Sequence, residues 1–372
     1  MYSYGKAVRI SIFGTSRGAA LGCVVDGLPA GFEPDLAAIR RELQLRRPRS
    51  SAESTSRSES DSFEIVSGLY QGRLSGDPLT VLFRNEDGAS GGERDTSIPR
   101  PSHADLAAHI KFGGFSDPRG GGAFSGRLTL PLVFVGALVR ELLLDAGSEI
   151  RSHIMSIGRL LDEGFDPMMT AFPTLDPYFP LIDASLKPRM ERLLASVREA
   201  GDSIGATLEC AALGVPAGIG EPFFDSVESE IAHLMLAVPG VHGIEFGAGF
   251  ELSRMRASEA NDPILPDLRT ASNNSGGVNG GIANGMPIIF RAAFRPVPSV
   301  SLVQSSVSLN TCEAAELIIS GRHDACILPR GCIISEAVTA IALYELLQRG
   351  RAHAPRQSKP QPSYAYDHGS KK

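Results

Sequence analysis

The sequence is poor in cysteine and has no cysteine pattern that would build a disulfide framework or a zinc site. Its five cysteines are an odd number, and neither a CxxC pair nor a cysteine and histidine cluster at zinc-ligand spacing occurs. Disulfide-rich secreted domains and zinc-binding modules are therefore disfavoured. We expect reduced thiols and no bound metal.

The chain also lacks an excess of positive charge and a long hydrophobic run. Its net charge of −6 argues against a nucleic-acid-binding protein, although it is compatible with a local basic pocket for a small anion. No apolar run appears long enough to cross a bilayer, and the first thirty residues resemble no signal peptide. We expect a cytoplasmic protein with neither nucleic acid nor membrane as a partner.

Lysine is scarce, because six of the 36 basic residues are lysine and 30 are arginine. Arginine suits the planar, bidentate recognition of phosphate and carboxylate, yet genomic base composition explains such a bias equally well. The stretch FGTSRGAALGCVVDGLPAG, residues 13–31, raises the same question locally. Its glycines, serine and arginine are typical of an anion cradle, whereas the simpler interpretation is a tight turn between a strand and a helix.

Hydrophobic periodicity predicts an α+β fold followed by a disordered tail, residues 351–372, and the length of the chain allows one large domain or about two to three. Strands and helices alternate too irregularly for a doubly wound parallel sheet. Residues 49–61 are rich in serine and charge, which favours either a disordered linker or a lid that closes over an anion. The predicted strands are 7–13, 63–72, 78–85, 203–216, 242–250 and 287–296, and the predicted helices are 35–46, 132–147, 187–200, 224–237 and 335–348.

Glycine-rich loops recur along the chain and indicate a large site built from loops. Together with their flanking motifs they resemble chorismate synthase over residues 5–349. The resemblance rests on FGTSRGAALGCVVDGLPAG, SGLYQGRLSGDP, RPSHAD, DPRGGGAFSGR, GDSIGATLECAALGVPAGIGEPFFD, GVHGIEFGAGF, NNSGGVNGGIANGMPIIFRAAFRPVPS and GRHDACILPR. The form FSGRLT is similar to one bacterial branch of that family.

The resemblance implies a single domain over residues 1–350, a layered β-α-β sandwich, a homotetramer and a phosphate lyase. The substrate would be 5-enolpyruvylshikimate 3-phosphate, which loses phosphate and a ring proton in a 1,4-trans elimination that gives chorismate. Reduced FMN would be the cofactor, with NADPH or an external reductase as the source of electrons. No net redox change occurs in this reaction, and the protein must tune the flavin and assist the leaving phosphate.

The same resemblance implies the roles of individual residues. His103 would lie near the flavin N1 edge, and Asp324 near N5, where a carboxylate helps to take the proton onward. Arg46, Ser125, Arg127 and Arg330 would bind the substrate. The implied cofactor-binding residues are Ala123, Phe124, Ser125, Pro239, Gly240, Gly280, Arg295, Pro296, Val297, Pro298, Ser299 and Arg322.

The opening motif departs from the family at one catalytic position. Ser16 and Arg17 stand in Gly-Thr-Ser-Arg-Gly, where the family's Gly-Glu-Ser-His-Gly supplies a histidine that protonates the departing phosphate. A guanidinium group neutralises phosphate but is a very poor proton donor. Three alternatives remain open: a chorismate synthase with reduced activity, an impaired paralogue that still binds flavin or an anionic ligand, and an enzyme that uses the same scaffold on a related enolpyruvyl or phosphorylated cyclic substrate.

Overall fold

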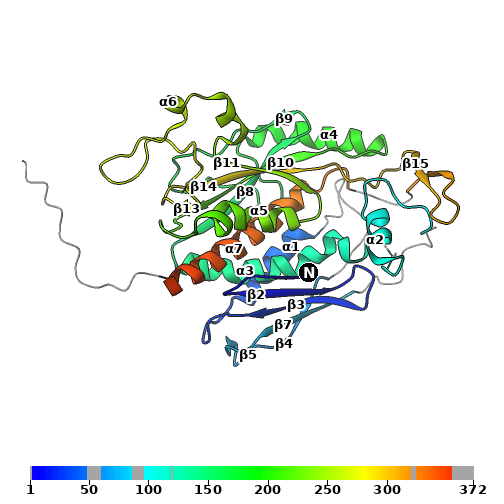
Figure 1. Ribbon diagram of the computed structural model, residues 1–372, viewed down its shortest axis with the longest axis horizontal. Coiled ribbons are helices and arrows are strands. Elements are labelled where there is room, and N and C mark those ends of the chain that lie inside the picture. Colours follow the sequence, from blue (N-terminus) through cyan, green and yellow to red (C-terminus); the bar gives the residue numbers. More distant parts are fainter. Residues whose placement is uncertain are drawn as a thin grey trace, which may run out of the picture.

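The fold consists of two five-stranded sheets that enclose a layer of helices (Figure 1). The computed structural model describes residues 2–47, 60–85, 96–117, 119, 121–319 and 324–353. Neighbouring strands run antiparallel in both sheets. The predicted α+β class is confirmed, and the order of layers is sheet, helices, sheet.

The first sheet has the strand order β1-β2-β3-β7-β4. Along its central strand β3, Leu21, Cys23 and Val25 are buried at alternate positions, so one face of the sheet packs on the helices. Its strands are β1 (Ser3–Tyr4), β2 (Arg9–Gly14), β3 (Ala20–Asp26), β7 (Leu79–Arg84) and β4 (Phe63–Ser67).

The opening glycine-rich stretch forms a hairpin between two strands of this sheet. The expected turn from a strand into a helix is wrong, because the chain after Gly18 continues as β3 and pairs back onto β2. Gly14 stands opposite Leu21 with φ of 96°, a left-handed conformation that favours glycine. The turn that holds Ser16 and Arg17 therefore lies at the ends of the inner strands β2 and β3.

The second sheet has the strand order β11-β14-β10-β8-β9. Its core strand β10 is buried at seven of its eight positions, since helices cover one face and the segment around Phe165 covers the other. Its strands are β11 (Val241–Phe246), β14 (Ile288–Phe294), β10 (Ala206–Leu213), β8 (Glu149–Ile157) and β9 (Leu160–Leu161). The strand β8 was not among the predicted ones.

Four helices fill the space between the sheets, and the remaining helices lie outside them (Figure 1). The inner helices are α1 (Leu36–Arg46), α3 (Thr129–Asp145), α5 (Val227–Ala237) and α7 (Leu328–His353). The outer ones are α2 (Asp105–Phe112), α4 (Lys187–Glu199) and α6 (Ala257–Ala260). Three small hairpins complete the described chain: β5 (Leu69–Tyr70) with β6 (Arg73–Leu74), β12 (Val278–Asn279) with β13 (Ile282–Ala283), and β15 (Gln304–Val307) with β16 (Ala314–Leu317).

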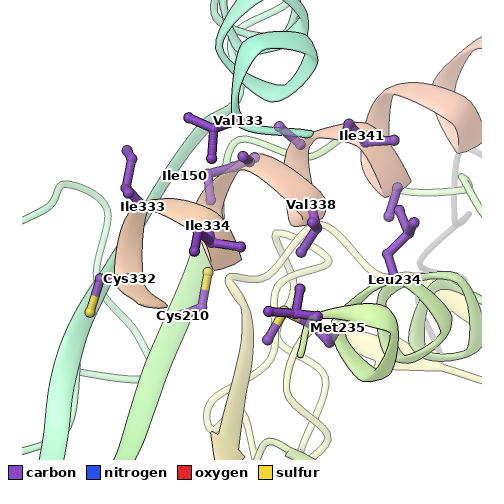
Figure 2. Close-up of a cluster of buried hydrophobic side chains, with 14 of the residues drawn as sticks. Val133, Ile150, Cys210, Leu234, Met235, Cys332, Ile333, Ile334, Val338 and Ile341 are labelled. Carbon is purple, nitrogen blue, oxygen red and sulfur yellow. The ribbon is translucent and has the colours of Figure 1, made fainter. Parts of the chain in front are cut away.

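The helix α7 is the centre of the core. In Figure 2 its side chain Ile334 points toward Cys210 of β10, and its side chain Val338 points toward Met235 of α5. It begins seven residues before the predicted helix and continues to His353, so residues 351–353 are not part of a tail, and 354–372 lie outside the described residues.

Contrary to the prediction from sequence, Leu328–Gly350 of α7 has the length and apolar composition of a membrane span. Of its most apolar window, however, 89% is buried inside the fold. A helix buried on all sides between two sheets has the same composition as a membrane helix, because both are surrounded by apolar groups. The apolar character of this segment therefore reflects its place in the core.

Candidate functional site

One cavity of about 500 Å³ lies at an end of the helical layer. Its walls include Arg46, the last residue of α1, Thr129, the first residue of α3, and Arg330 in the first turn of α7. The N-termini of α3 and α7 thus border the cavity, and the unpaired N–H groups of a helix N-terminus carry partial positive charge. The position alone favours an anionic ligand.

Two buried arginines on the cavity wall share one carboxylate. Nη2 of Arg46 donates a hydrogen bond to Oδ2 of Asp61 at 2.9 Å, and Nη1 of Arg127 donates to Oδ1 at 2.6 Å. The three residues are 5%, 8% and 6% exposed for Arg46, Arg127 and Asp61 respectively. Asp61 therefore fixes two guanidinium groups that come from α1 and from the turn before α3.

A third arginine faces the same space. Arg330 forms an ion pair with Asp324, which lies four residues before the first residue of α7. Burial, with the nearby positive charge of Arg46, lowers the pKa of Arg330 to about 10, so this group is still protonated at neutral pH. Three guanidinium groups consequently meet two carboxylates, Asp61 and Asp324, and this wall keeps an excess of positive charge.

Asp324 has one oxygen to offer to a bound molecule. Its side chain is 8% exposed, and among the described residues Oδ1 has no hydrogen-bond partner. A buried acceptor without a partner is costly, and a ligand that donates a proton or a hydrogen bond would relieve that cost. The carboxylate is thus arranged for ligand chemistry as well as for its ion pair with Arg330.

A second part of the cavity wall is built from segments that are far apart in the sequence. Nε2 of His103 lies 2.8 Å from Oγ of Ser299, and Nη1 of Arg295 donates to the carbonyl oxygen of Ser102 at 3.2 Å. The backbone N–H of Arg295 donates to the carbonyl oxygen of Gly240 at 2.9 Å. These contacts join the segment before α2, the turn before β11 and the chain after β14 into one surface.

Most of the predicted site residues meet in this cavity. Ser125 is also the N-cap of the short 3₁₀ turn Gly126–Leu128, where its Oγ accepts a hydrogen bond from the Arg127 backbone N–H at 3.2 Å. The predicted residues that line the cavity are Arg46, His103, Phe124, Ser125, Arg127, Pro239, Gly240, Arg295, Pro296, Val297, Pro298, Asp324 and Arg330.

Five predicted residues of the described chain do not line it: Ser16, Arg17, Ala123, Gly280 and Ser299. Ser299 still reaches it through His103, and the backbone N–H of Ser16 donates to the carbonyl oxygen of Gly122 at 3.1 Å. Gly280 lies in the β12–β13 turn with φ of 60°. Arg322, like Arg49 and Arg57 of the predicted lid, lies outside the described residues.

Sequence reasoning missed several residues of the site, above all Asp61 and Asn85. In the sequence, Asp61 ends the serine-rich segment and Asn85 ends a predicted strand. Nε of Arg127 donates to Oδ1 of Asn85 at 3.0 Å, so the amide holds the second edge of that guanidinium group. A polar residue directly before or after a strand is a weak signal, because a pairing across 66 or 42 positions is not visible in the sequence.

The comparisons with known proteins agree with this architecture. The chorismate synthase family model matches residues 8–347. The chain belongs to the chorismate synthase family. It is 41% identical to the chorismate synthase of Dehalococcoides mccartyi strain 195 over 353 residues, covering 93% of this chain and 96% of the relative. It is also 41% identical to that of Thermococcus gammatolerans over 352 residues, covering 94% and 98%.

A solved structure shares the fold. The chain superposes on a crystal structure of chorismate synthase with a TM-score of 0.72 at 26% identity, and the match covers 93% of each chain. Because the similarity spans nearly the whole of both chains, the cavity belongs to the lyase fold of the chorismate synthase family, a family of aromatic biosynthesis.

Proposed function

We propose that the chain eliminates phosphate from 5-enolpyruvylshikimate 3-phosphate by 1,4-trans elimination, giving chorismate, with reduced FMN as cofactor. One observation carries this proposal: Arg46, Arg127 and Arg330 converge on a single cavity whose other wall holds His103. Asp324 lies in the same cavity with an oxygen available for a ligand. Fixed positive charge and a proton acceptor are what this elimination requires.

The substrate carries one phosphate and two carboxylates, so several fixed cations must hold it. Guanidinium groups bind both kinds of anion through paired N–H donors. In our proposal Arg46, Arg127 and Arg330 supply these donors, and Ser125 adds a hydroxyl beside them. Their burial makes each interaction stronger than it would be in water, because the local dielectric is low.

The residues of the other wall fit a flavin. Gly240 leaves the wall without a side chain, and a Cβ built there would meet Ile327 Cδ1 at 2.7 Å. Arg295 would hold the FMN phosphate with the backbone of Pro296–Ser299, and His103 would balance the charge of the reduced ring. Pro239, Phe124, Ala123, Gly280 and Arg322 complete the proposed cofactor contacts.

Bound reduced FMN would supply electron density to the breaking C–O bond and recover it as the ring proton leaves. Asp324 would then accept that proton at Oδ1, and Arg330 would hold the carboxylate in position through their ion pair. The electrons would come from NADPH or an external reductase.

The phosphate leaves without a histidine at position 17 in this proposal. We propose that the FSGRLT form belongs to one bacterial branch of the family and that Arg17 occupies the position of the family's histidine. Arg17 would neutralise and orient the leaving group with Ser16, and water would supply the proton. General acid catalysis typically contributes about two to four orders of magnitude, so we expect a slowed enzyme.

An anaerobic assay of the purified protein with reduced FMN and the substrate tests this function. We expect phosphate and chorismate in equal amounts, with no product when FMN is oxidised. Chorismate that does not exceed the enzyme-free control would refute the proposed activity.

A second candidate is an impaired paralogue that binds flavin or an anionic ligand without turnover. The observation that favours it is the position of Arg17, which does not line the cavity. Titration of the protein with reduced FMN distinguishes the two. Binding without chorismate supports the paralogue, and binding with chorismate supports the enzyme.

We further propose a cytoplasmic homotetramer. Phe223 and Phe224 are 87% and 91% exposed, which is unusual for aromatic side chains that have no partner surface. Light scattering coupled to size-exclusion chromatography measures the assembly, and a monomer at micromolar concentration would contradict it.

A further inference from the structure

We infer that Asp61 is a built-in counter-anion of the anion-binding site: it fixes Arg46 and Arg127 in register and keeps free phosphate out of the space between them. The inference rests on the proposed function, because it assigns a role within the same cavity. It makes Asp61 a positioning and specificity residue that touches two substrate-binding arginines rather than the reacting atoms.

The geometry of the carboxylate supports this role. Each of its oxygens accepts one guanidinium hydrogen bond, Oδ1 from Arg127 and Oδ2 from Arg46. Side-chain exposures are 3% for Asp61 and 7% for each arginine, so water screens neither ion pair. Two guanidinium groups bridged by one carboxylate are held at a fixed separation, which is what a substrate with several anionic groups needs.

The backbone at Asp61 explains how one short side chain reaches both arginines. Asp61 has φ of 49°, a left-handed conformation that is rare outside glycine, asparagine and aspartate. It lies just before β4, at the edge of the first sheet, whereas Arg46 ends α1 and Arg127 precedes α3. This backbone conformation therefore places the carboxylate of Asp61 where the start of β4, the end of α1 and the turn before α3 meet.

The charge balance explains the second part of the role. Arg46, Arg127 and Arg330 would together attract any phosphate, including the product of the proposed reaction. A carboxylate already bound between two of them competes with a small free anion for the same N–H groups. The larger substrate also binds through other contacts. Its affinity therefore depends more on the fixed positions of the two guanidinium groups than on the net charge of the space between them.

The test compares two variants that keep the left-handed backbone accessible, Asp61→Asn and Asp61→Gly. We expect KM for the substrate to rise by roughly tenfold in both, while inhibition by inorganic phosphate becomes stronger by roughly tenfold. These two effects have opposite signs. A merely structural defect would weaken the binding of both anions.

Glu336→Gln is the matched control. Glu336 is a buried carboxylate that pairs with Arg140 at 2.9 Å and does not line the cavity. We expect it to lower stability without strengthening phosphate inhibition. Asp61→Gly also leaves a gap that formate can fill, so added formate should lower KM in this variant and not in Asp61→Asn.

Binding of inorganic phosphate, followed by calorimetry, separates this inference from the proposed function, since it needs no turnover. Tighter phosphate binding by Asp61→Asn in a protein that makes no chorismate would sustain the inference and refute the function. Unchanged or weaker phosphate binding by both folded variants would overturn the inference, whatever the activity of the parent chain.

Discussion

Asn85 and Arg127 form a hydrogen bond that ties the opening hairpin turn to the anion-binding wall. Oδ1 of Asn85 accepts from Nε of Arg127 at 3.0 Å, and Nδ2 donates to the carbonyl oxygens of Thr15 and Gly18 at 3.1 and 2.8 Å. These two carbonyls flank Ser16 and Arg17. One amide therefore sets the position of that turn relative to the arginine.

We expect Asn85→Asp to lower kcat/KM by roughly tenfold or more, since a carboxylate offers no donor to the two carbonyl oxygens and repels both. The loss should fall on turnover and substrate affinity together, because the turn and Arg127 both shift. Steady-state kinetics under anaerobic conditions measure it.

Asn274→Asp is the control for this substitution. Nδ2 of Asn274 also donates to a backbone carbonyl, that of Ala260 at 3.2 Å, but its hydrogen-bond partners, unlike Arg127, do not line the cavity. Equal losses of kcat/KM in the two variants would show that Asn85 acts on general stability rather than on the site.

Arg17→His tests whether a single proton donor separates this chain from a fast enzyme. Histidine titrates near neutral pH, so it can donate a proton where arginine cannot. We expect chorismate formation to rise by roughly tenfold or more, with a rate that falls as pH rises above about 6.5, where imidazolium is lost.

The pH profile of the parent chain is the control, and this particular fall should be missing from it. A rate for Arg17→His that stays at or below the parent rate at every pH would contradict a single lost acid. It would instead favour the impaired paralogue.

Much of the fold could be predicted where local signals were strong. The helix expected at 35–46 is α1, with Asp35 as a side-chain cap that accepts hydrogen bonds from two backbone N–H groups of the first turn. The helix expected at 187–200 is α4. In both, the periodic pattern and the end signals lie within one short stretch of sequence.

The strand β8 was missed because its burial depends on distant partners. Ser152 and His153 are buried polar residues in the middle of the strand, so the alternation of apolar residues is broken. The backbone N–H of Ser152 donates a hydrogen bond to Oε1 of Glu336, and Nε2 of His153 lies 3.2 Å from Oε2 of Glu209. Polar residues in a sheet core become plausible only when those partners are known.

The residues of the site also divide into those that the sequence indicates and those whose role depends on distant partners. Its arginines, His103 and Asp324 were named through resemblance to a family, and most of them do line one cavity. Asp61 carried no such signal, because its role is to pair with Arg46 and Arg127 and pairing depends on three dimensions. The left-handed backbone that makes the pairing possible is equally invisible in the sequence.

Gly136 of α3 allows a close contact with the helix α7 in the core. A Cβ built there would lie 2.3 Å from Cβ and 2.4 Å from Cα of Ala337 in α7. We expect Gly136→Ala to lower the free energy of unfolding by about 1–3 kcal/mol, since two buried helices would have to separate. Urea unfolding followed by circular dichroism measures the change.

Gly350→Ala is the matched helical control, because its nearest neighbour would be Cγ2 of Ile219 at an ordinary 3.7 Å. Alanine favours the helix by up to about 1 kcal/mol relative to glycine, so this variant should be as stable as the parent or more so. A loss of stability in Gly350→Ala equal to that in Gly136→Ala would rule out the close contact as the cause.

From the exposure of the cysteines, we expect iodoacetamide to modify the native protein at a single thiol at neutral pH. Cys312 is exposed on the turn between β15 and β16, whereas the other four cysteines are buried. Burial raises the pKa of Cys23 to about 12 and that of Cys326 to about 11, and it also raises the pKa values of Cys210 and Cys332. Because the thiolate is the nucleophile, these four thiols should stay unmodified until the chain unfolds.

Mass spectrometry should therefore find one adduct on the folded chain, none on folded Cys312→Ser and five on the parent chain in denaturant. More than one adduct on the folded parent chain would contradict the buried positions of these thiols.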